Sequence, residues 1–181
     1  MHSFELDVHT HTVSSGHYTK DTITDMVKYA SLTGLKLLGI SEHGPAIPHS
    51  CTLSYFRGLS TAPSIRMGVR ILYGAEVNIL DFSGALDLPE SIMKNLDYCM
   101  AGMHTPCLAP GTKEENTAAC LRAIENPYIR IIAHPDDTKY PVDYSRLIEA
   151  AIDNRVLLEI NNSSLAPNGY RGNVKENDRA I

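Results

Sequence analysis

Short apolar runs alternate with amphipathic segments along the whole chain. The apolar runs that we expect to form strands are 4–8, 35–40, 70–75, 96–103, 128–133 and 156–160. Apolar residues recur at helical spacing in three segments between these runs, namely 22–33, 114–125 and 143–154. Strands that alternate with helices are typical of βα units and a mainly parallel sheet. The pattern therefore predicts an α/β fold.

Local signals mark the ends of the predicted helices. Thr22 with Asp25 three residues later is typical of a capping box, and Gly34 is suited to the end of the same helix. Asn126-Pro127 should stop the second helix, because proline cannot continue it. The stretch 50–67 contains Pro63 and few periodic apolar positions, so we expect a loop or a broken helix there.

The composition is that of a globular protein. Its 181 residues suffice for one domain with a substantial core, which we expect 1–181 to form. The longest apolar runs are far below the roughly 20 residues that a membrane-spanning helix needs. The N-terminus lacks the basic and apolar regions of a secretory signal. We therefore expect a cytoplasmic protein with no membrane partner.

Charge and cysteine usage exclude further classes. The net charge is −5 and the 16 Lys and Arg residues are scattered, which disfavours nucleic acid as a partner but leaves room for a small anionic substrate. The four cysteines form no C-x-x-C pair. We expect reduced thiols rather than disulfides or a zinc ribbon.

Five of the six predicted strands run into a histidine or a glutamate. In chain order these residues are His9 and His11, Glu42 and His43, Glu76, His104, and His134. A single histidine at a strand end is more often a surface residue than a ligand. The carboxyl ends of parallel strands share one rim, however, so the whole set is expected to converge on one site.

The residue types in this set favour metal binding. Neutral imidazole suits Zn, Fe and Mn ions, and the Glu76 carboxylate is able to bridge two of them. His17 comes from the loop after the first strand and could reach the same rim. Six histidines and one glutamate are too many ligands for one tetrahedral ion. The sequence therefore predicts several divalent metal ions.

The motifs that carry these residues resemble those of the polymerase and histidinol phosphatase (PHP) domain family, and within it the YcdX-like phosphatases. The resemblance covers essentially the whole chain, and its motifs follow the family's order. They are Asp7-Val8-His9-Thr10-His11-Thr12, Gly16-His17, Ser41-Glu42-His43-Gly44-Pro45, Gly74-Ala75-Glu76-Val77-Asn78, Ala101-Gly102-Met103-His104, Ala133-His134-Pro135 and Leu158-Glu159-Ile160-Asn161-Asn162-Ser163-Ser164. The resemblance implies a distorted (βα)7 TIM-like barrel that hydrolyses phosphoesters.

The resemblance also implies roles for the site residues. His9, His11 and Glu76 would bind the first metal, Glu76, His104 and His134 the second, and His17 with His43 the third. Zinc is the first choice, with manganese or iron as alternatives, and a complete chain would hold up to three ions. We assign catalytic roles to Glu76, His104, His17 and His43. A hydroxide that bridges two metals would attack the phosphorus of a small phosphorylated substrate.

Two departures from the family pattern matter. Glu42 stands where the family usually has Asp, so a longer side chain must make any contact of that carboxylate. The family's late Gly-Ser-Asp-x-His motif, which supplies an Asp and a His ligand, does not occur before Ile181. We therefore expect a barrel that is incomplete at its C-terminus, a third metal with two histidines only, and exposed strand edges through which chains could associate.

Several alternative functions stay open. Within the family, these are a histidinol phosphatase and a PHP-type nuclease. An amidohydrolase-type enzyme would want a lysine where His104 stands. A non-catalytic metal-binding or regulatory domain is favoured by the missing late motif. The sequence does not choose the natural substrate or the physiological metal.

A few other polar residues receive weaker predictions. Asp7 is expected to orient a ligand histidine or to cap the backbone, and Asn161 to face the site or to form a turn. His2 and His49 are expected at the surface. Arg171 is expected to be solvated, with contact to a substrate phosphate as the alternative.

Overall fold

The computed structural model describes residues 5–17, 19–166, 169 and 171–181, which form two compact units. The first unit contains the chain up to Glu76 together with Leu88–Cys99, and the second contains Val77–Asp87 together with Met100–Ile181. Strands β4 (Val69–Asn78) and β5 (Tyr98–Gly102) each contribute to both units. A single domain over 1–181 stays a prediction.

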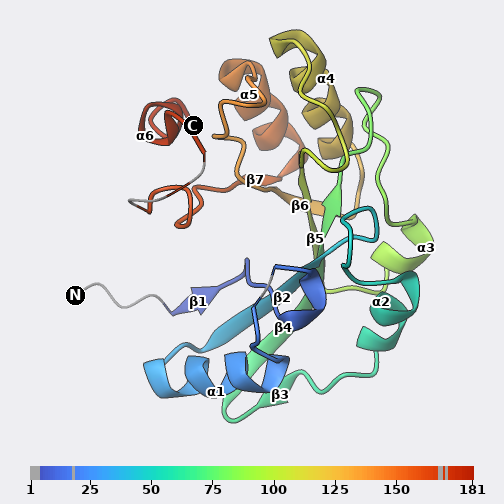
Figure 1. Ribbon diagram of the computed structural model, residues 1–181, viewed down its shortest axis with the longest axis vertical. Coiled ribbons are helices and arrows are strands. Elements are labelled where there is room, and N and C mark those ends of the chain that lie inside the picture. The colour runs from blue at the N-terminus through green and yellow to red at the C-terminus, as the bar shows by residue number, and fades with distance from the viewer. Residues whose placement is uncertain (1–4, 18, 167–168, 170) are drawn as a thin grey trace. The chain divides into compact units, whose positions relative to one another are not determined.

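The first unit is a small parallel sheet with helices (Figure 1). Its elements are β1 (Leu6–Asp7), the 3-10 helix η1 (Val13–Ser15), α1 (Ile23–Thr33), β2 (Leu37–His43), α2 (Leu53–Leu59), β3 (Ile65–Arg66), most of β4, and α3 (Glu90–Met93). Strand β2 lies between β1 and β4 and pairs parallel with both, while β3 pairs antiparallel with β4. Helix α1 packs against β2, and α2 packs against α3.

Helix α1 begins and ends as the sequence predicts. The Thr22 side chain accepts a hydrogen bond from the Asp25 backbone N–H (3.3 Å), and the Asp25 carboxylate accepts one from the Thr22 N–H (2.9 Å). Gly34 ends the helix with a φ of 81°, a conformation that suits glycine. Val27 and Ala30 are buried on the inner face. The capping box and the amphipathic pattern are both confirmed.

The packing of Tyr98 explains why two positions in the strands of the first unit are glycine. Its hydroxyl donates a hydrogen bond to the Val8 carbonyl (2.6 Å). A Cβ atom at Gly39 would lie 2.8 Å from the Val8 Cα, and one at Gly74 would lie 2.6 Å from the Tyr98 ring. Contacts this short require a shift of backbone or of a buried ring. Both strands therefore need glycine where the tyrosine packs.

Replacing Gly39 with Ala is expected to lower the free energy of unfolding by about 2 kcal/mol, because the added methyl group overpacks a buried backbone contact. Gly58→Ala is the matched control, since Gly58 lies inside helix α2 and a Cβ atom there meets no atom within 4 Å. That control should stabilise by roughly 0.5–1 kcal/mol. Urea unfolding followed by circular dichroism measures both, and equal midpoints for the two variants would contradict the packing described for Tyr98.

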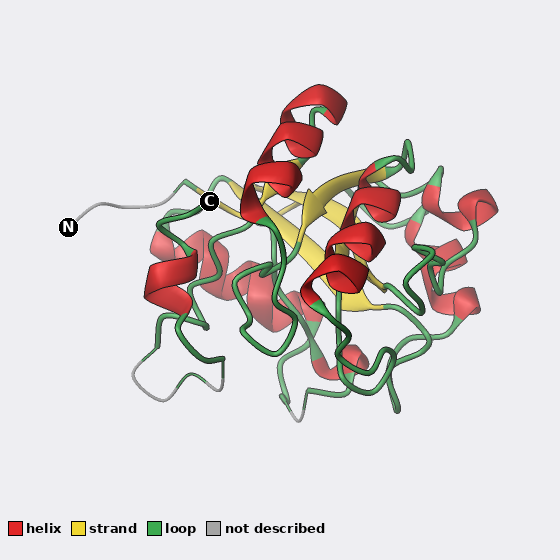
Figure 2. Cartoon of the chain, turned by 90° about the horizontal axis from the view of Figure 1, so that it is seen from above, coloured by secondary structure: helices red, strands yellow, loops and turns green. Residues whose placement is uncertain are grey.

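The second unit contains strands or parts of strands from β4 to β7 and two long helices. Its elements are the end of β4, most of β5, α4 (Lys113–Ile124), β6 (Ile129–Ile132), α5 (Tyr144–Asn154), β7 (Leu157–Leu158) and α6 (Val174–Asn177). Strand β6 pairs parallel with β7 and neighbours β5 on its other side. Helices α4 and α5 lie side by side, with α4 against β6 and α5 against β7. Figure 2 shows all strands in yellow and all helices in red.

Helix α4 begins at a capping box that the sequence analysis missed. The Thr112 side chain accepts from the Glu115 N–H, and the Glu115 carboxylate accepts from the Thr112 N–H (2.8 Å). Helix α5 begins after Asp143, as predicted, and its apolar face buries Leu147 and Ala151. Both helices confirm the predicted segments to within a residue or two.

The predicted strands lie at the observed positions in the sequence, but their predicted ends differ from the observed ones. Strands β1 and β7 are shorter than the apolar runs that predicted them, whereas β2 and β4 continue through Glu42-His43 and Glu76. Strand β3 and the short helices α3 and α6 were not predicted. Strand β3 joins β4 through Met67 and Gly68, which both have positive φ, as in the hairpin turns that Asn-Gly usually forms. The sequence Met67-Gly68 is not typical of such turns, so the hairpin was not predicted.

The cysteines agree with the prediction of reduced thiols. Among the described residues none of the four forms a disulfide, and Cys51, Cys99 and Cys120 are buried. Burial raises the pKa of the Cys120 thiol to about 12, so it stays protonated and unreactive. Within the part of the chain that the structure describes, no helix is long and apolar enough to cross a membrane.

Candidate metal centre

The register of two parallel strands places the first pair of site residues together. His43 at the end of β2 lies directly opposite Glu76 of β4. The distance from the His43 Nδ1 to the Glu76 Oε2 is 2.9 Å. Both side chains are almost completely buried, with the glutamate at 0% exposure. Pairing along the sheet therefore brings together two residues that are 33 positions apart, as the strand-end argument predicted.

The segment after β1 is fastened to β2 by backbone and side-chain hydrogen bonds. The Thr10 hydroxyl donates to the Gly39 carbonyl (2.6 Å), and the Thr10 N–H donates to the Ser41 hydroxyl (3.1 Å). The Ser41 N–H in turn donates to the Thr10 carbonyl (3.0 Å). Because Thr10 stands between His9 and His11, these contacts fix both histidines relative to β2.

A tight turn then presents His17. The 3-10 helix η1 ends at Gly16, which has a φ of 73°. A Cβ atom there would lie 3.0 Å from the Pro48 carbonyl oxygen, so both the conformation and the space favour glycine. The chain turns back at this point, and His17 reaches the other histidines of the unit.

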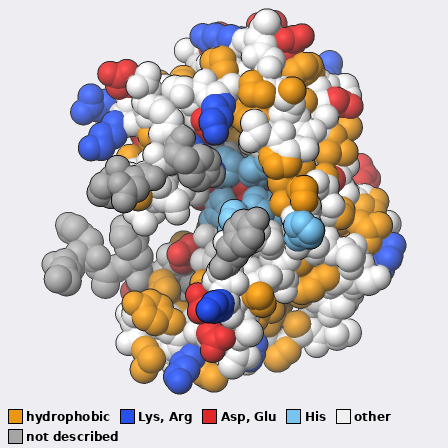
Figure 3. Space-filling model, viewed as in Figure 1, with side chains coloured by type: hydrophobic (Ala, Val, Ile, Leu, Met, Phe, Trp, Pro, Cys, Tyr) orange, Lys and Arg blue, Asp and Glu red, His pale blue; other side chains and the backbone are white. Residues whose placement is uncertain are grey.

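The imidazole rings of the first unit form one cluster. The ring centroids of His11, His17 and His43 are 4.5, 4.5 and 4.6 Å apart in the three pairings. The Nε2 atoms of His17 and His43 are 2.6 Å apart, and those of His9 and His11 are 3.1 Å apart. Histidine side chains are visible in pale blue on the face of the molecule in Figure 3.

Glu76 lies among the histidines of the first unit. Its Oε2 atom is 3.3 Å from the His9 Nε2 and 3.2 Å from the His11 Nε2, in addition to its contact with His43. Burial lowers the pKa of His11 below the ordinary histidine value, although Glu76 opposes this shift. His11 is therefore neutral at pH 7, which is the form that binds metal.

This set of donor atoms fits a metal ion. His11, His17 and His43 each offer one ring nitrogen, and these nitrogens all lie within 4.8 Å of one another. Two imidazole nitrogens bound at 2.0–2.1 Å to one tetrahedral zinc would be about 3.3 Å apart. Within this set the Nε2 atoms of His17 and His43 are 2.6 Å apart, which is shorter than that value. The three nitrogens are therefore close enough together to bind one ion.

Two buried residues support the histidine cluster without belonging to it. The Glu42 carboxylate accepts hydrogen bonds from the Thr12 N–H (3.1 Å) and from the Thr12 hydroxyl. The Ser15 hydroxyl lies 3.0 Å from the His11 Nδ1 and accepts from the His43 backbone N–H (2.9 Å). Glu42 thus contacts the loop beside His11, and Ser15 was missed because serine in a loop gives no sequence signal of its own.

The second unit holds the other two predicted ligands. His104 follows β5, and its Nδ1 lies 2.7 Å from the Asn78 Oδ1. The ring of His134 lies 5.2 Å from that of His104, at 73°. The His134 backbone, at a φ of 32°, donates its N–H to the Glu159 carboxylate (2.8 Å). Neither Asn78 nor Glu159 was assigned a role from the sequence, although both stand in the motifs that carry the resemblance.

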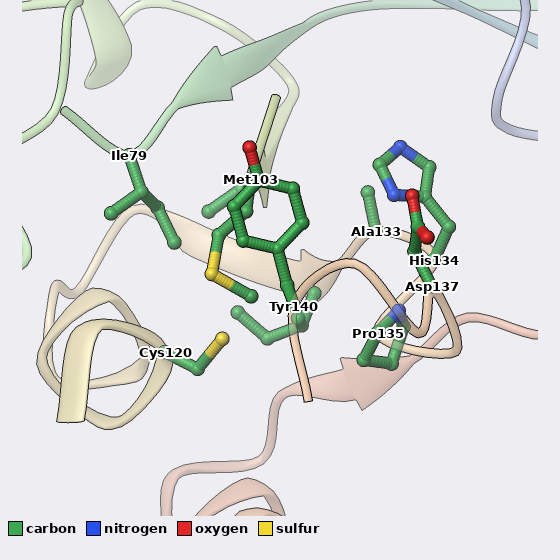
Figure 4. A pocket seen from close by; sticks show the side chains of 10 residues that line it. Ile79, Met103, Cys120, Ala133, His134, Pro135, Asp137 and Tyr140 are labelled. Atoms are coloured by element: carbon green, nitrogen blue, oxygen red, sulfur yellow. The ribbon is translucent and has the colours of Figure 1, made fainter. Parts of the chain in front are cut away.

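A small pocket of the second unit lies beside His134. Figure 4 shows Cys120, Met103 and Ile79 on one side of it, and His134 near Asp137 on the other. Its lining is mainly apolar, which is consistent with the 5% exposure of His134.

The weaker predictions have mixed outcomes. Asp7 accepts the His9 backbone N–H (3.1 Å), which is the capping role, and Asn161 accepts from Ser163 and Ser164 in a turn. Arg171 is not solvated: its side chain is 7% exposed and donates to the Ser164 hydroxyl (2.8 Å). It also lies 3.8 Å from the Asp137 carboxylate, a contact that a sequence pattern does not reveal. His49 is exposed, and His2 lies outside the described residues.

The structure therefore gathers His9, His11, His17, His43 and Glu76 in the first unit, and His104 with His134 in the second. His11 is as close to His17 and His43 as these two are to each other. The division of these seven residues among three metals, and the joining of the two sets into one site, stay predictions.

Comparison with known sequences identifies the relatives of this chain. The family model described as PHP domain matches residues 7–163. A probable phosphatase of Clostridium novyi is 50% identical over 162 residues, which are 89% of this chain and 66% of that protein. A probable phosphatase of Acetivibrio thermocellus is 41% identical over 174 residues, which are 96% of this chain and 72% of that protein. The chain thus spans about two thirds of the length of these curated relatives.

Comparison with solved structures agrees on the fold. The chain is similar to the crystal structure of histidinol phosphate phosphatase from Lactococcus lactis complexed with zinc, L-histidinol and phosphate, with a TM-score of 0.54 and 15% identity. The match covers 85% of this chain and 72% of that one. This likeness and the parallel strands of each unit confirm the predicted α/β fold class. Because the PHP domain model matches residues 7–163, which are most of the sequence, the chain belongs to the PHP domain family.

Proposed function

We propose that this protein is a metal-dependent phosphatase that hydrolyses small phosphorylated substrates. The observation that carries the proposal is the set of three histidines around the buried carboxylate of Glu76, with His17 beside one of them. Curated relatives that are 41 and 50% identical are named probable phosphatases, which supports phosphate ester hydrolysis as the reaction at this cluster.

In this proposal the metal ions are held by His9, His11, His17, His43 and Glu76 of the first unit together with His104 and His134 of the second. Zinc is the first choice, as in the Lactococcus lactis protein, and manganese or iron are alternatives. Up to three ions would bind. When bound, they would lower the pKa of water to supply a hydroxide nucleophile and would polarise the phosphoryl group.

The charge of the proposed ligands favours a phosphate monoester. Six of the seven ligands are histidines, which bind metal as neutral groups, and Glu76 is the one carboxylate in the set. The site therefore keeps an excess of positive charge when divalent cations are bound. A phosphate dianion matches that excess, and the same charges stabilise the transition state of phosphoryl transfer.

Removal of metal is the direct test of this function. The purified protein is expected to hydrolyse p-nitrophenyl phosphate, to lose that activity in a chelator, and to regain it with zinc, manganese or iron. The rate should rise toward pH 7–8 if ionisation of water at the metals limits it. Measured release of p-nitrophenol before and after metal addition decides the outcome.

Three results would redirect the proposal. Full activity in the chelator would contradict metal dependence. Tight metal binding with no hydrolysis of any phosphate ester would favour a non-catalytic metal-binding domain. Hydrolysis of oligonucleotides in preference to histidinol phosphate and other monoesters would favour the nuclease alternative over a phosphatase.

A further inference from the structure

The segment between β4 and β5 begins with a tight hairpin in the second unit. An antiparallel bridge joins Ile79 to Leu86, and the Asp87 N–H donates to the Asn78 carbonyl (3.2 Å). The Asp81 carboxylate accepts from the Ala85 N–H (3.2 Å) across the turn. Because the hairpin is closed at both its tip and its base, Asp87 is held opposite Asn78.

Asn78 is fully buried and connects Asp87 to His104. Its backbone N–H donates to the Asp87 Oδ1 (2.8 Å), and its side-chain Nδ2 donates to the Asp87 Oδ2 (2.5 Å). Its Oδ1 lies 2.7 Å from the His104 Nδ1. The three side chains thus form a chain of hydrogen bonds that ends on the imidazole ring.

The chemistry of this chain of hydrogen bonds determines the state of His104. An ionised carboxylate only accepts hydrogen bonds, so the amide nitrogen of Asn78 must face Asp87. The amide oxygen must then face His104 and can only accept. The His104 Nδ1 therefore carries the proton, and in the neutral ring the lone pair that can bind a metal is on Nε2.

We propose that Asn78, oriented by Asp87, is a positioning residue that fixes the tautomer and the ring orientation in which His104 binds metal through Nε2. The inference rests on the proposed function, because it takes His104 to be a metal ligand. Hydrogen bonds to the second nitrogen of a ligand histidine typically change metal affinity by 10–100-fold. Asn78 is expected to have an effect of this size.

Asn116 provides a matched control in the same unit. It is also fully buried, and within the described part of the chain its side chain bonds to backbone atoms, accepting from the Gly111 N–H (3.0 Å) and donating to the Gly111 and Pro141 carbonyls (3.1 Å each). Asn116→Ala removes a buried amide of the same size without touching a histidine. It therefore reports the general effect of losing such a group.

The first experiment measures zinc affinity by competition with a chromophoric chelator. Asn78→Ala is expected to weaken the affinity for zinc by roughly 10–100-fold, whereas Asn116→Ala should change it by less than about threefold. Both variants are measured at a temperature at which circular dichroism shows them to be folded. Equal affinities in the two variants would overturn the inference and leave the proposed function standing.

An exchange of the two side chains tests the direction of the hydrogen bonds. In the double variant Asn78→Asp with Asp87→Asn, the carboxylate at position 78 still accepts from the His104 Nδ1. The amide at position 87 still forms a hydrogen bond to the side chain at position 78. We expect this variant to restore zinc affinity to within about threefold of the wild type, while Asn78→Ala does not. Failure of the exchange in a folded protein would contradict the proposed orientation.

Nuclear magnetic resonance reads the tautomer without any metal. Long-range proton–nitrogen spectra of the metal-free wild type should show His104 protonated at Nδ1, and Asn78→Ala should show a shift toward the Nε2-protonated form. A wild-type His104 protonated at Nε2 would overturn the inference. If the wild type showed the expected tautomer but bound no zinc, manganese or iron, the proposed function would fail and the positioning of His104 by Asn78 would remain.

Discussion

Replacing Glu76 with Gln is expected to lower kcat/KM for an aryl phosphate by roughly three orders of magnitude. The substitution keeps the shape of the side chain and removes the charge that faces His9, His11 and His43 at 3.3, 3.2 and 2.9 Å. An amide binds divalent cations less well than a carboxylate and cannot bridge two of them as effectively. Steady-state kinetics and metal content of the same preparation measure the effect.

Glu149→Gln is the control for this variant. Glu149 lies on the exposed face of helix α5, so the same change in charge and volume should leave both activity and metal content unchanged. A Glu76→Gln protein that stays folded and keeps half of the wild-type activity would place the chemistry elsewhere in the molecule.

Replacing His17 with Ala is expected to lower kcat/KM by about 100-fold and to reduce the metal content per chain. His17 contributes the ring nitrogen that lies 2.6 Å from the His43 Nε2, and its ring is within 4.5 Å of His11. Its loss leaves an incomplete donor set in the first unit. Kinetics at saturating metal should recover part of the activity, because added metal compensates for weaker binding.

His49→Ala is the matched control for His17. Both histidines are exposed residues of the first unit, and His49 belongs to none of the groups of ligand atoms that could hold a metal among the described residues. The control should behave as the wild type. Equal losses in the two variants would show that the cluster of His11, His17 and His43 does not bind the metal that drives the reaction.

The main features of the fold were predictable because they depend on local patterns. Alternating apolar runs and helical segments identified the parallel strands, and the capping box at Thr22 identified the start of α1. Strand ends also predicted the approach of His43 to Glu76, since a parallel register places the ends of β2 and β4 side by side. The short antiparallel strand β3 was missed because two residues are too few for a periodic pattern.

The residues that support the ligands were not predictable in the same way. Ser15 touches His11 and His43, and Asn78 touches His104, through hydrogen bonds that form only in the folded chain. Their residue types are common in loops and give no metal signal. Arg171 was expected in solvent for a similar reason, since its burial depends on a loop without periodic pattern. The late ligands implied by the resemblance, the number of metals and chain association all stay predictions.

The metal content of the purified protein tests the central claim most directly. Inductively coupled plasma mass spectrometry is performed on the wild type after incubation with zinc, manganese and iron and removal of unbound ions. Because His9, His11, Glu76, His104 and His134 suffice for two metals in the proposed arrangement, we predict at least two bound transition-metal ions per chain. Less than one ion per chain would contradict a multinuclear metal centre.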